Sequence, residues 1–322
     1  MALDEENVLR MGMSGLIGVS IQMQRVYKLV YTVSAYRYPV SITGEVGTGK
    51  EATARLIHSV SNRRTKPFVA VGRSMFVPSW IEPELFGYEK RVAGQSSESK
   101  VGLLGVAGAG TLYFDEVAEL PVSVQAKLHR TLEENEFWPI GAAAAVSFSA
   151  RVIVATQRNL EAQVRAGAFR EDLFFQLNSM QIKLPPLRER KSDIPLLVDA
   201  FIDKYAEEGS TIGFSAAAMN CLLAYEWPGN VRELEMTVQR ALAFSAGSSV
   251  EPEDLLQLPH TPELGTSDPK ALPADQFEIE RLAIVQALRE SSGDTTAAAH
   301  LLGINRSTLS RRLKYHRLDN WI

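Results

Sequence analysis

A glycine-rich loop near the beginning of the chain limits its possible folds more than any other feature of the sequence. A short apolar run at residues 40–42 precedes this loop, which reads Gly44-Glu45-Val46-Gly47-Thr48-Gly49-Lys50. Glycines allow backbone N–H groups to turn toward an anion, and a lysine at the end of the loop reaches the β- and γ-phosphates of a nucleotide. Glu51 follows where Ser or Thr is usual, so the loop alone is an imperfect match.

A second motif supports the phosphate site. The apolar run at residues 112–114 ends at Asp115 and Glu116. This is the layout of a buried strand that delivers one carboxylate to Mg²⁺ and a second to a water molecule. A glycine-rich loop alone is common by chance and then marks an ordinary turn, whereas the two motifs at this spacing are not common. Together they predict a phosphate-binding site.

Strand-like and helix-like segments alternate through the first part of the chain. Further β-type runs occupy residues 68–71, 152–155 and 182–184. This alternation predicts an α/β domain with a mostly parallel sheet and a nucleotide at the carboxyl ends of its strands. From residue 191 to residue 245 the strand-like runs stop, and a small helical subdomain is predicted.

Size and composition fit a chain of two or three globular domains. Its 322 residues are 45% hydrophobic, which is ordinary for a protein with a full core. No apolar run approaches the roughly 20 residues needed to span a bilayer. The N-terminus, residues 1–6, is acidic and unlike a signal peptide, so we expect no membrane association and a cytoplasmic location. The single Cys221 excludes an internal disulfide, and within its apolar stretch we expect a buried structural thiol.

The C-terminal segment is basic although the chain carries a net charge of −4. Residues 252–274 are rich in proline and have little periodicity, which is typical of a linker. Beyond it, residues 295–302 predict a short helix, Gly303 a turn, and the apolar pair Leu309 and Leu313 a following helix. Two helices joined by a tight turn, the second one basic, predict a helix-turn-helix that binds double-stranded DNA.

The candidate DNA-binding residues lie on or beside the last helix: Arg306, Ser307, Thr308, Arg311, Arg312 and Lys314. The phosphate backbone would supply most of the affinity, and base edges would select the site. The alternative is a solvated helix that packs on the rest of the chain.

Six strings give the chain a wider resemblance: residues 44–51, 84–87, 110–116, 169–173, 184–190 and 227–234. The most specific read Leu-Pro-Pro-Leu-Arg-Glu-Arg and Trp-Pro-Gly-Asn-Val-Arg-Glu-Leu. In these strings the chain resembles the sigma-54-dependent transcription activators, or bacterial enhancer-binding proteins. The resemblance covers their central AAA+ ATPase domain (residues 14–250) and their Fis-type helix-turn-helix (residues 277–318). An acidic residue such as Glu51 after the loop lysine is the habit of this family.

The resemblance implies a set of roles around ATP and Mg²⁺. Residues 44–51 wrap the phosphates, with the lysine among the catalytic groups. Asp115 holds Mg²⁺ and Glu116 polarises the attacking water. Arg232 senses the nucleotide from the lid of the same subunit, whereas Arg170 reaches into the site of a neighbouring subunit. A site completed by a neighbour implies a hexameric ring, and the DNA-binding domain is expected to dimerise.

The resemblance also implies domain boundaries and a partner. The expected parts are an N-terminal tail (1–13), an AAA+ α/β ATP-binding subdomain (14–187), a helical lid (188–250), a linker (251–276) and the helix-turn-helix domain (277–322). The tail leaves no room for the receiver or sensor domain that many relatives carry. Sigma-54 RNA polymerase holoenzyme is the partner that the family implies.

The chain departs from the family pattern in four places. The string Gly-Ala-Phe-Thr-Gly-Ala, which grips sigma-54 in the family, is replaced by Arg91-Val92-Ala93-Gly94-Gln95-Ser96. The segment that continues to Lys100 is polar and rich in serine (residues 95–99), which suits an exposed loop and not an apolar grip. Gly72 stands where the family usually has an Asn that restrains the catalytic Glu, and Gln157 stands where Asn or His is commoner. Gln176 replaces the second arginine that the family extends into a neighbouring subunit. Because Gln176 carries no positive charge, hydrolysis is expected to be slow.

Three hypotheses stay open. The first is a DNA-bound AAA+ regulator that binds ATP and hydrolyses it slowly but no longer remodels sigma-54 polymerase. The second is an ordinary sigma-54-dependent activator whose loop tolerates substitution and which couples ATP hydrolysis to open-complex formation. The third is a nucleotide-gated repressor or co-regulator without turnover, motivated by Gly72 and Gln176.

Overall fold

The computed structural model describes residues 15–89, 99–206, 212–245 and 249–255, and the single positions 288, 291 and 295. Internal contacts divide the chain into two units, Met1–Pro259 and His260–Ile322. The predicted tail, the substituted loop at residues 91–96, most of the linker and the helix-turn-helix with all its candidate DNA-binding residues lie outside the described residues.

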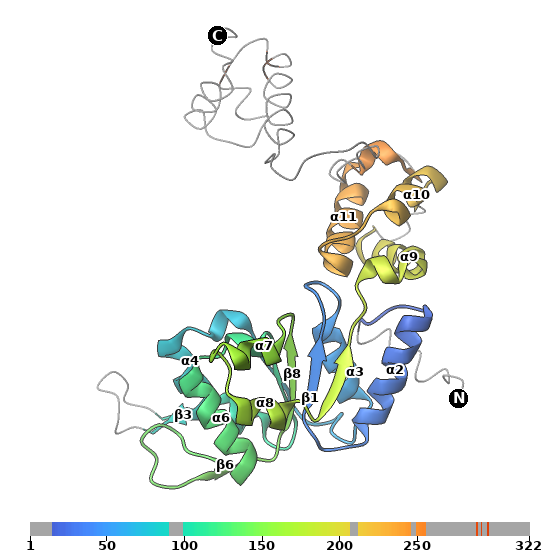
Figure 1. The fold of residues 1–322 in the computed structure, drawn as a ribbon. Helices are drawn as coiled ribbons and strands as arrows, with labels where there is room; N and C mark the ends of the chain where they lie inside the picture. Colours follow the sequence, from blue (N-terminus) through green and yellow to red (C-terminus); the bar gives the residue numbers. More distant parts are fainter. Residues whose placement is uncertain are drawn as a thin grey trace. The chain divides into compact units, whose positions relative to one another are not determined.

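The first unit is built on a five-stranded parallel sheet with the order β2-β5-β8-β1-β9. The strands are β1 (Val40–Thr43), β2 (Phe68–Val71), β5 (Thr111–Phe114), β8 (Arg151–Thr156) and β9 (Met180–Lys183). Each predicted strand is present, with ends that differ by at most two residues. The predicted α/β class with a parallel sheet is confirmed (Figure 1).

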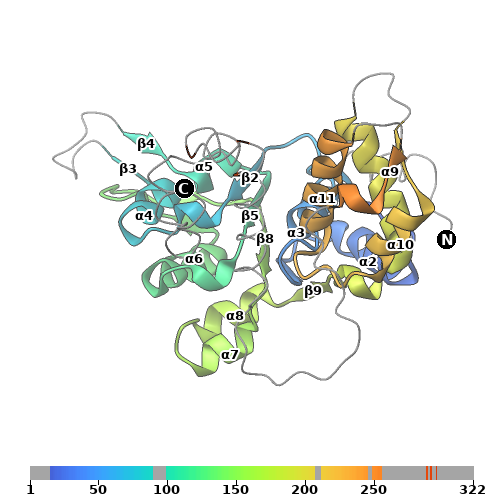
Figure 2. The ribbon, with the colours of Figure 1, turned by 90° about the horizontal axis from the view of Figure 1, so that it is seen from above.

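Helices cover both faces of this sheet (Figures 1 and 2). The helices of one face are α2 (Ile21–Ser34) and α3 (Lys50–Ser59). Those of the other are α4 (Pro78–Phe86), α5 (Leu103–Ala107), α6 (Val122–Glu134), α7 (Leu160–Arg165) and α8 (Glu171–Leu177). Alternate side chains of β5 enter the two cores: Leu112 and Phe114 pack with the second set of helices and Tyr113 with the first. Burial on both faces explains why the strands are continuous apolar runs.

Short elements connect the larger ones. The two-residue strands β3 (Gly87–Tyr88) and β4 (Lys100–Val101) form one antiparallel pair, and β6 (Glu136–Phe137) and β7 (Val146–Ser147) form another. The 3-10 turns are η1 (Arg73–Met75), η2 (Val117–Glu119), η3 (Leu187–Glu189), η4 (Lys191–Asp193) and η5 (Pro252–Asp254). Turn η1 follows β2 after Gly72, and η2 follows β5 after Asp115 and Glu116, so both turns lie at the carboxyl edge of the sheet.

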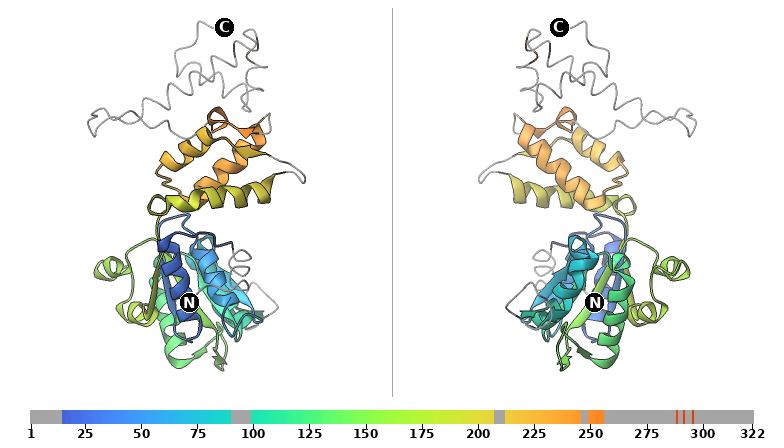
Figure 3. Two further views of the ribbon diagram at one scale, coloured as in Figure 1. Left: turned by 90° about the vertical axis from the view of Figure 1, so that its right-hand side faces the viewer. Right: turned by 90° about the vertical axis from the view of Figure 1, so that its left-hand side faces the viewer.

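The helical part after the sheet consists of α9 (Ile194–Tyr205), α10 (Ala216–Ala224) and α11 (Asn230–Phe244), which share one apolar core around the fully buried Trp227 (Figure 3). The prediction that this region is wholly helical is wrong in one detail. Strand β10 (Gly213–Phe214) pairs in parallel with β11 (Ser249–Val250). Such a two-residue pair has no periodicity of its own, so the sequence does not reveal it.

The expectation of a buried thiol at Cys221 is also wrong, because this side chain is exposed. On α10 the buried positions are Ala218 and Leu222, one helical turn apart, and Cys221 lies on a different face. Within the described ranges, no helix is long and apolar enough to cross a bilayer.

Candidate functional site

The glycine-rich loop joins β1 to α3 in the conformation that its glycines allow. Gly47 has a φ of +76° and Gly49 a φ of +102°, both in the left-handed region that other residues avoid. Gly49 is the cap of α3, whose first residue is Lys50. The loop therefore presents backbone N–H groups at the N-terminus of a ten-residue helix, an arrangement that favours anions.

Lys50 is buried at the end of the loop and connects it to the second motif. Its Nζ donates to the carbonyl oxygens of Gly44 (3.0 Å) and Glu45 (3.3 Å). The same Nζ forms an ion pair with Oε1 of Glu116 at 3.2 Å, and both side chains are 8% exposed. An ammonium has three N–H donors, so this set occupies all of them.

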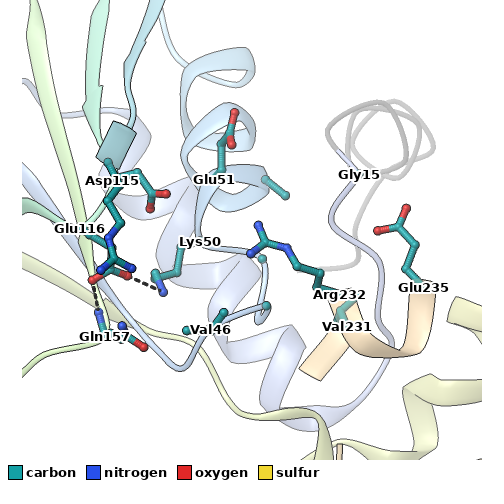
Figure 4. Close-up of a pocket in the computed structure, with 14 residues that line it drawn as sticks. Gly15, Val46, Lys50, Glu51, Asp115, Glu116, Gln157, Val231, Arg232 and Glu235 are labelled. Carbon is teal, nitrogen blue, oxygen red and sulfur yellow. Dashed lines mark hydrogen bonds and ion pairs between the residues drawn. The ribbon is translucent and has the colours of Figure 1, made fainter. Parts of the chain in front are cut away.

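Glu116 is held in a strained backbone conformation at the end of β5. Its φ is +56°, which is uncommon for a residue other than glycine. Its Oε2 accepts a hydrogen bond from the backbone N–H of Gln157 (3.1 Å) and a long one from Oγ1 of Thr156 (3.4 Å). Figure 4 shows Lys50 and Gln157 converging on this carboxylate. Glu116 is thus fixed between the glycine-rich loop and the end of β8.

Asp115 lies beside Glu116 and is positioned by two neighbouring elements. Its backbone N–H donates to the carbonyl of Val71 at the end of β2, 3.0 Å away. The hydroxyl of Tyr113 donates to Oδ1 of Asp115 at 3.1 Å. Burial, and then the charge of Asp115, raise the pKa of Tyr113, so the phenol stays protonated and keeps donating.

These groups open onto a cavity of about 330 Å³ that the lid helix α11 closes on one side (Figure 4). Its lining consists of Gly15, Val46, Gly47, Gly49, Lys50, Glu51, Ala52, Arg73, Asp115, Glu116, Gln157, Val231, Arg232 and Glu235. Four of these are carboxylates and three are cations, a difference of one negative charge. Figure 4 shows Arg232 reaching toward the cavity from the side opposite Asp115.

The predicted loop residues divide into two groups. Val46, Gly47, Gly49, Lys50 and Glu51 line the cavity. Gly44, Glu45 and Thr48 shape the loop instead, for example through the bond from Oγ1 of Thr48 to the carbonyl of Glu45 at 2.8 Å.

The loop is bonded to the start of the lid through Glu45. Arg188 donates to both carboxylate oxygens of Glu45, at 2.8 and 2.6 Å, and Nδ2 of Asn230 donates to one of them at 3.2 Å. The hydrogen bonds from Arg188 lower the pKa of Glu45 to about 2. On the other side of the loop, the backbone N–H of Val231 donates to the carbonyl of Gly47 at 3.0 Å. We call these contacts the loop–lid clamp.

Asn230 is the centre of this clamp and was not among the predicted site residues. It is fully buried, and its φ of +54° is a conformation that Asn tolerates better than most residues. Its Oδ1 accepts from the N–H of Leu187 (2.8 Å), while Nδ2 also donates to the carbonyl of Val46 (2.9 Å). Two signals in the sequence pointed to it: its place in the string Trp-Pro-Gly-Asn-Val-Arg-Glu-Leu and the left-handed preference of Asn.

Arg170 lies away from the cavity of its own chain. It is exposed at the cap of α8, and its guanidinium donates to Oδ1 (3.0 Å) and Oδ2 (2.6 Å) of Asp172. This bonding lowers the pKa of Asp172. The nearby Gln176, where the resemblance expects a second arginine, has a buried Oε1 that finds no hydrogen-bond partner among the residues that the structure describes.

Gly72 and Arg73 follow β2 at the edge of the cavity. Among the described residues, a Cβ at Gly72 would meet only Oγ of Ser74, at 4.0 Å, so there is room for a Cβ at the position where the family carries Asn. Glu116 is restrained by Lys50 and the end of β8 instead. Arg73 lines the cavity although nothing in its local sequence suggested this.

A parallel sheet whose first glycine-rich loop meets paired carboxylates under a helical lid defines the AAA+ class of P-loop proteins. Three family matches cover the chain: "Sigma-54 interaction domain" over residues 16–183, "AAA+ ATPase lid domain" over 188–270, and "Bacterial regulatory protein, Fis family" over 277–316. The chain belongs to the family of sigma-54-dependent transcriptional regulators with an AAA+ domain and a Fis-type helix-turn-helix. The predicted resemblance is confirmed.

Individual relatives agree with this assignment. The transcriptional regulatory protein ZraR of Escherichia coli K12 is 38% identical over 304 residues, covering 93% of this chain and 68% of ZraR. The regulatory protein AtoC of the same organism is 38% identical over 289 residues, covering 87% of this chain but only 63% of AtoC. The structure of NtrX from Brucella abortus in complex with ATP is similar with a TM-score of 0.70 and 33% identity, covering 94% of this chain and 69% of NtrX.

Proposed function

We propose that the chain is a DNA-binding regulator that binds ATP with Mg²⁺, hydrolyses it slowly, and no longer remodels sigma-54 polymerase. The observation that carries the nucleotide part is the cavity in which Lys50, Asp115 and Glu116 face Arg232 of the lid. NtrX, which is similar in structure, has been solved with ADP and with ATP, and this supports the same class of ligand here.

The charges of the cavity fit a nucleotide that binds together with a divalent cation. Because the lining already carries one excess negative charge, a polyphosphate alone would be poorly compensated. Asp115 supplies the carboxylate oxygen that Mg²⁺ prefers as a ligand. Bound there, Mg²⁺ would neutralise charge on the β- and γ-phosphate oxygens.

In the proposed hydrolysis, Lys50, Glu116 and Arg232 have different roles. A phosphate that draws Lys50 away from Glu116 would leave this carboxylate held by Gln157 and Thr156, with its Oε1 ready to accept a hydrogen bond from water. The water oxygen would then bond to the γ-phosphorus while the bond to the β,γ-bridging oxygen breaks, giving ADP and inorganic phosphate, and the proton that the water loses would pass through Glu116 to solvent. Arg232 would bind the phosphates from the lid, so closure of the lid would follow the nucleotide state.

A neighbouring subunit would complete the site. Arg170 is exposed and lies outside its own cavity, which supports a role across a subunit boundary in a hexameric ring. There its guanidinium would have to exchange Asp172 for the transferring phosphoryl group, an interaction worth about 10³–10⁵ in rate in other systems. We propose slow hydrolysis because Gln176 is neutral where the resemblance expects a second arginine.

Residues 91–96 support the loss of sigma-54 remodelling, because they lack the Phe and Thr of the family's contact string. A second candidate is the ordinary activator, and the family match over residues 16–183, which spans these positions, favours it. A hydrolysis-deficient repressor is the third, and phosphate release that depends on the protein would exclude it.

The deciding experiment is open-complex formation by the purified chain, ATP and sigma-54 holoenzyme on a promoter with its own upstream site. We expect ATP binding and slow phosphate release, both lost in Lys50→Ala, but no open complex. An open complex that disappears in Lys50→Ala would refute the loss of coupling and establish the ordinary activator.

DNA binding has its own test. We expect Arg311→Ala and Arg312→Ala to weaken binding to the operator and to flatten its dependence on salt, because each would remove a phosphate contact. The isolated segment 277–322 should be a dimer that reads two half-sites. If both variants kept the same affinity for the operator and the same salt dependence, the DNA-reading helix would have to be formed by other residues.

A further inference from the structure

One cation of the cavity has no role in the function proposed above. Arg73 is the first residue of η1, two residues beyond the end of β2, and it lines the cavity. Because the backbone N–H of Asp115 donates to the carbonyl of Val71, the last residue of β2, Arg73 enters the cavity from the side of the carboxylates, whereas Arg232 comes from the lid. The cavity thus has an arginine on each of two sides and the loop lysine between them.

The ion pair of Arg73 leaves it available for a second partner. Its Nε pairs with Oε2 of Glu119 at 2.7 Å, while Nη2 of Arg158 pairs with Oε1 of the same carboxylate at 3.0 Å. Two guanidinium groups thus share one carboxylate, so the cluster keeps one positive charge. The side chain of Arg73 is 65% exposed, and an ion pair this exposed is weak. Exchanging Glu119 for a phosphate would therefore cost Arg73 little.

We propose that Arg73 binds the terminal phosphate of a nucleoside triphosphate from within the same subunit and so distinguishes triphosphate from diphosphate. A guanidinium matches the geometry of phosphate oxygens, and it keeps its charge at any pH the protein meets. The position is suitable because Arg73 lines the same cavity as Glu116, the residue proposed to face the attacking water at the γ-phosphate. This inference rests on the proposed nucleotide binding and adds a cation to that same site.

A matched pair of variants tests the proposal. Arg73→Gln and Arg158→Gln each remove one positive charge that is paired with Glu119. They differ in position, because Arg158 is not among the described residues that line the cavity. The measurement is a titration of the full chain, with Mg²⁺, by fluorescent ADP and by a fluorescent β,γ-imido analogue of ATP. Thermal unfolding of each variant establishes that it is folded.

We expect Arg73→Gln to weaken binding of the triphosphate analogue by about tenfold and to change ADP binding by less than about twofold. Arg158→Gln should leave both affinities unchanged, and Arg73→Lys should recover part of the loss. Equal losses for the two nucleotides, or the same loss in both variants, would overturn the inference. If the unchanged protein bound neither nucleotide, the proposed function itself would fail, which is a distinguishable result.

Discussion

Replacement of Asn230 by alanine is the sharpest test of the loop–lid clamp. The change removes the acceptor of the buried Leu187 N–H, and an unsatisfied buried donor costs about 1–3 kcal/mol. It also removes the two hydrogen bonds from Nδ2 to Val46 and Glu45, each worth about 1 kcal/mol. Alanine at a φ of +54° adds about 1 kcal/mol of backbone strain. We expect the free energy of unfolding to fall by about 4–6 kcal/mol in total, which is a large effect for one substitution.

The assay is equilibrium unfolding in urea followed by circular dichroism, together with nucleotide titration. Arg232 lies two residues further along α11, so nucleotide affinity should fall as well. Asn230→Gly serves as the matched control, because it loses the same hydrogen bonds but tolerates the positive φ. It should recover about 1 kcal/mol of the loss. A loss below about 1 kcal/mol in Asn230→Ala, with unchanged nucleotide affinity, would refute the clamp.

Two further predictions concern the same clamp. In Gly47→Ala the new Cβ would lie 2.1 Å from the carbonyl oxygen of Gly229, so we expect nucleotide binding to be lost. Gly167→Ala is the control, because Gly167 has a similar φ of +70° and a Cβ there would meet no described atom within 4 Å. Its free energy of unfolding should therefore fall only by the backbone strain of about 1 kcal/mol. Equal unfolding energies for the two variants would contradict this packing. Because folding lowers the pKa of Glu45 from 4.5 to about 2, its stabilising contribution is complete above pH 4.5 and is lost as the pH falls through 2. Solvent exposure limits this contribution to about 1 kcal/mol, and Glu45→Gln should remove the dependence in denaturation curves measured across that range.

Local patterns in the sequence predicted the sheet and the order of its motifs. The run at residues 152–155 became β8, Arg151–Thr156, because a strand buried on both faces must be apolar throughout. The glycine-rich loop and the pair Asp115 and Glu116 are also local, and they meet because the carboxyl ends of parallel strands lie at one edge of the sheet.

Other features depend on residues that the chain brings together from far apart. Asn230 bonds to Glu45 across 185 positions, and no periodicity links them. Cys221 is exposed because α10 turns a different face to the core, although its sequence is apolar on more than one face.

The sequence by itself therefore determined the fold class, the family and the types of residue available for phosphate chemistry, because these depend on local spacing. Only the tertiary structure decided which of those groups are engaged with one another: Lys50 with Glu116, the loop with the lid, and Arg73 with the edge of the cavity. The physical reason is that hydrogen bonds and ion pairs act over about 3 Å, a distance that only the packed chain sets for residues remote in sequence.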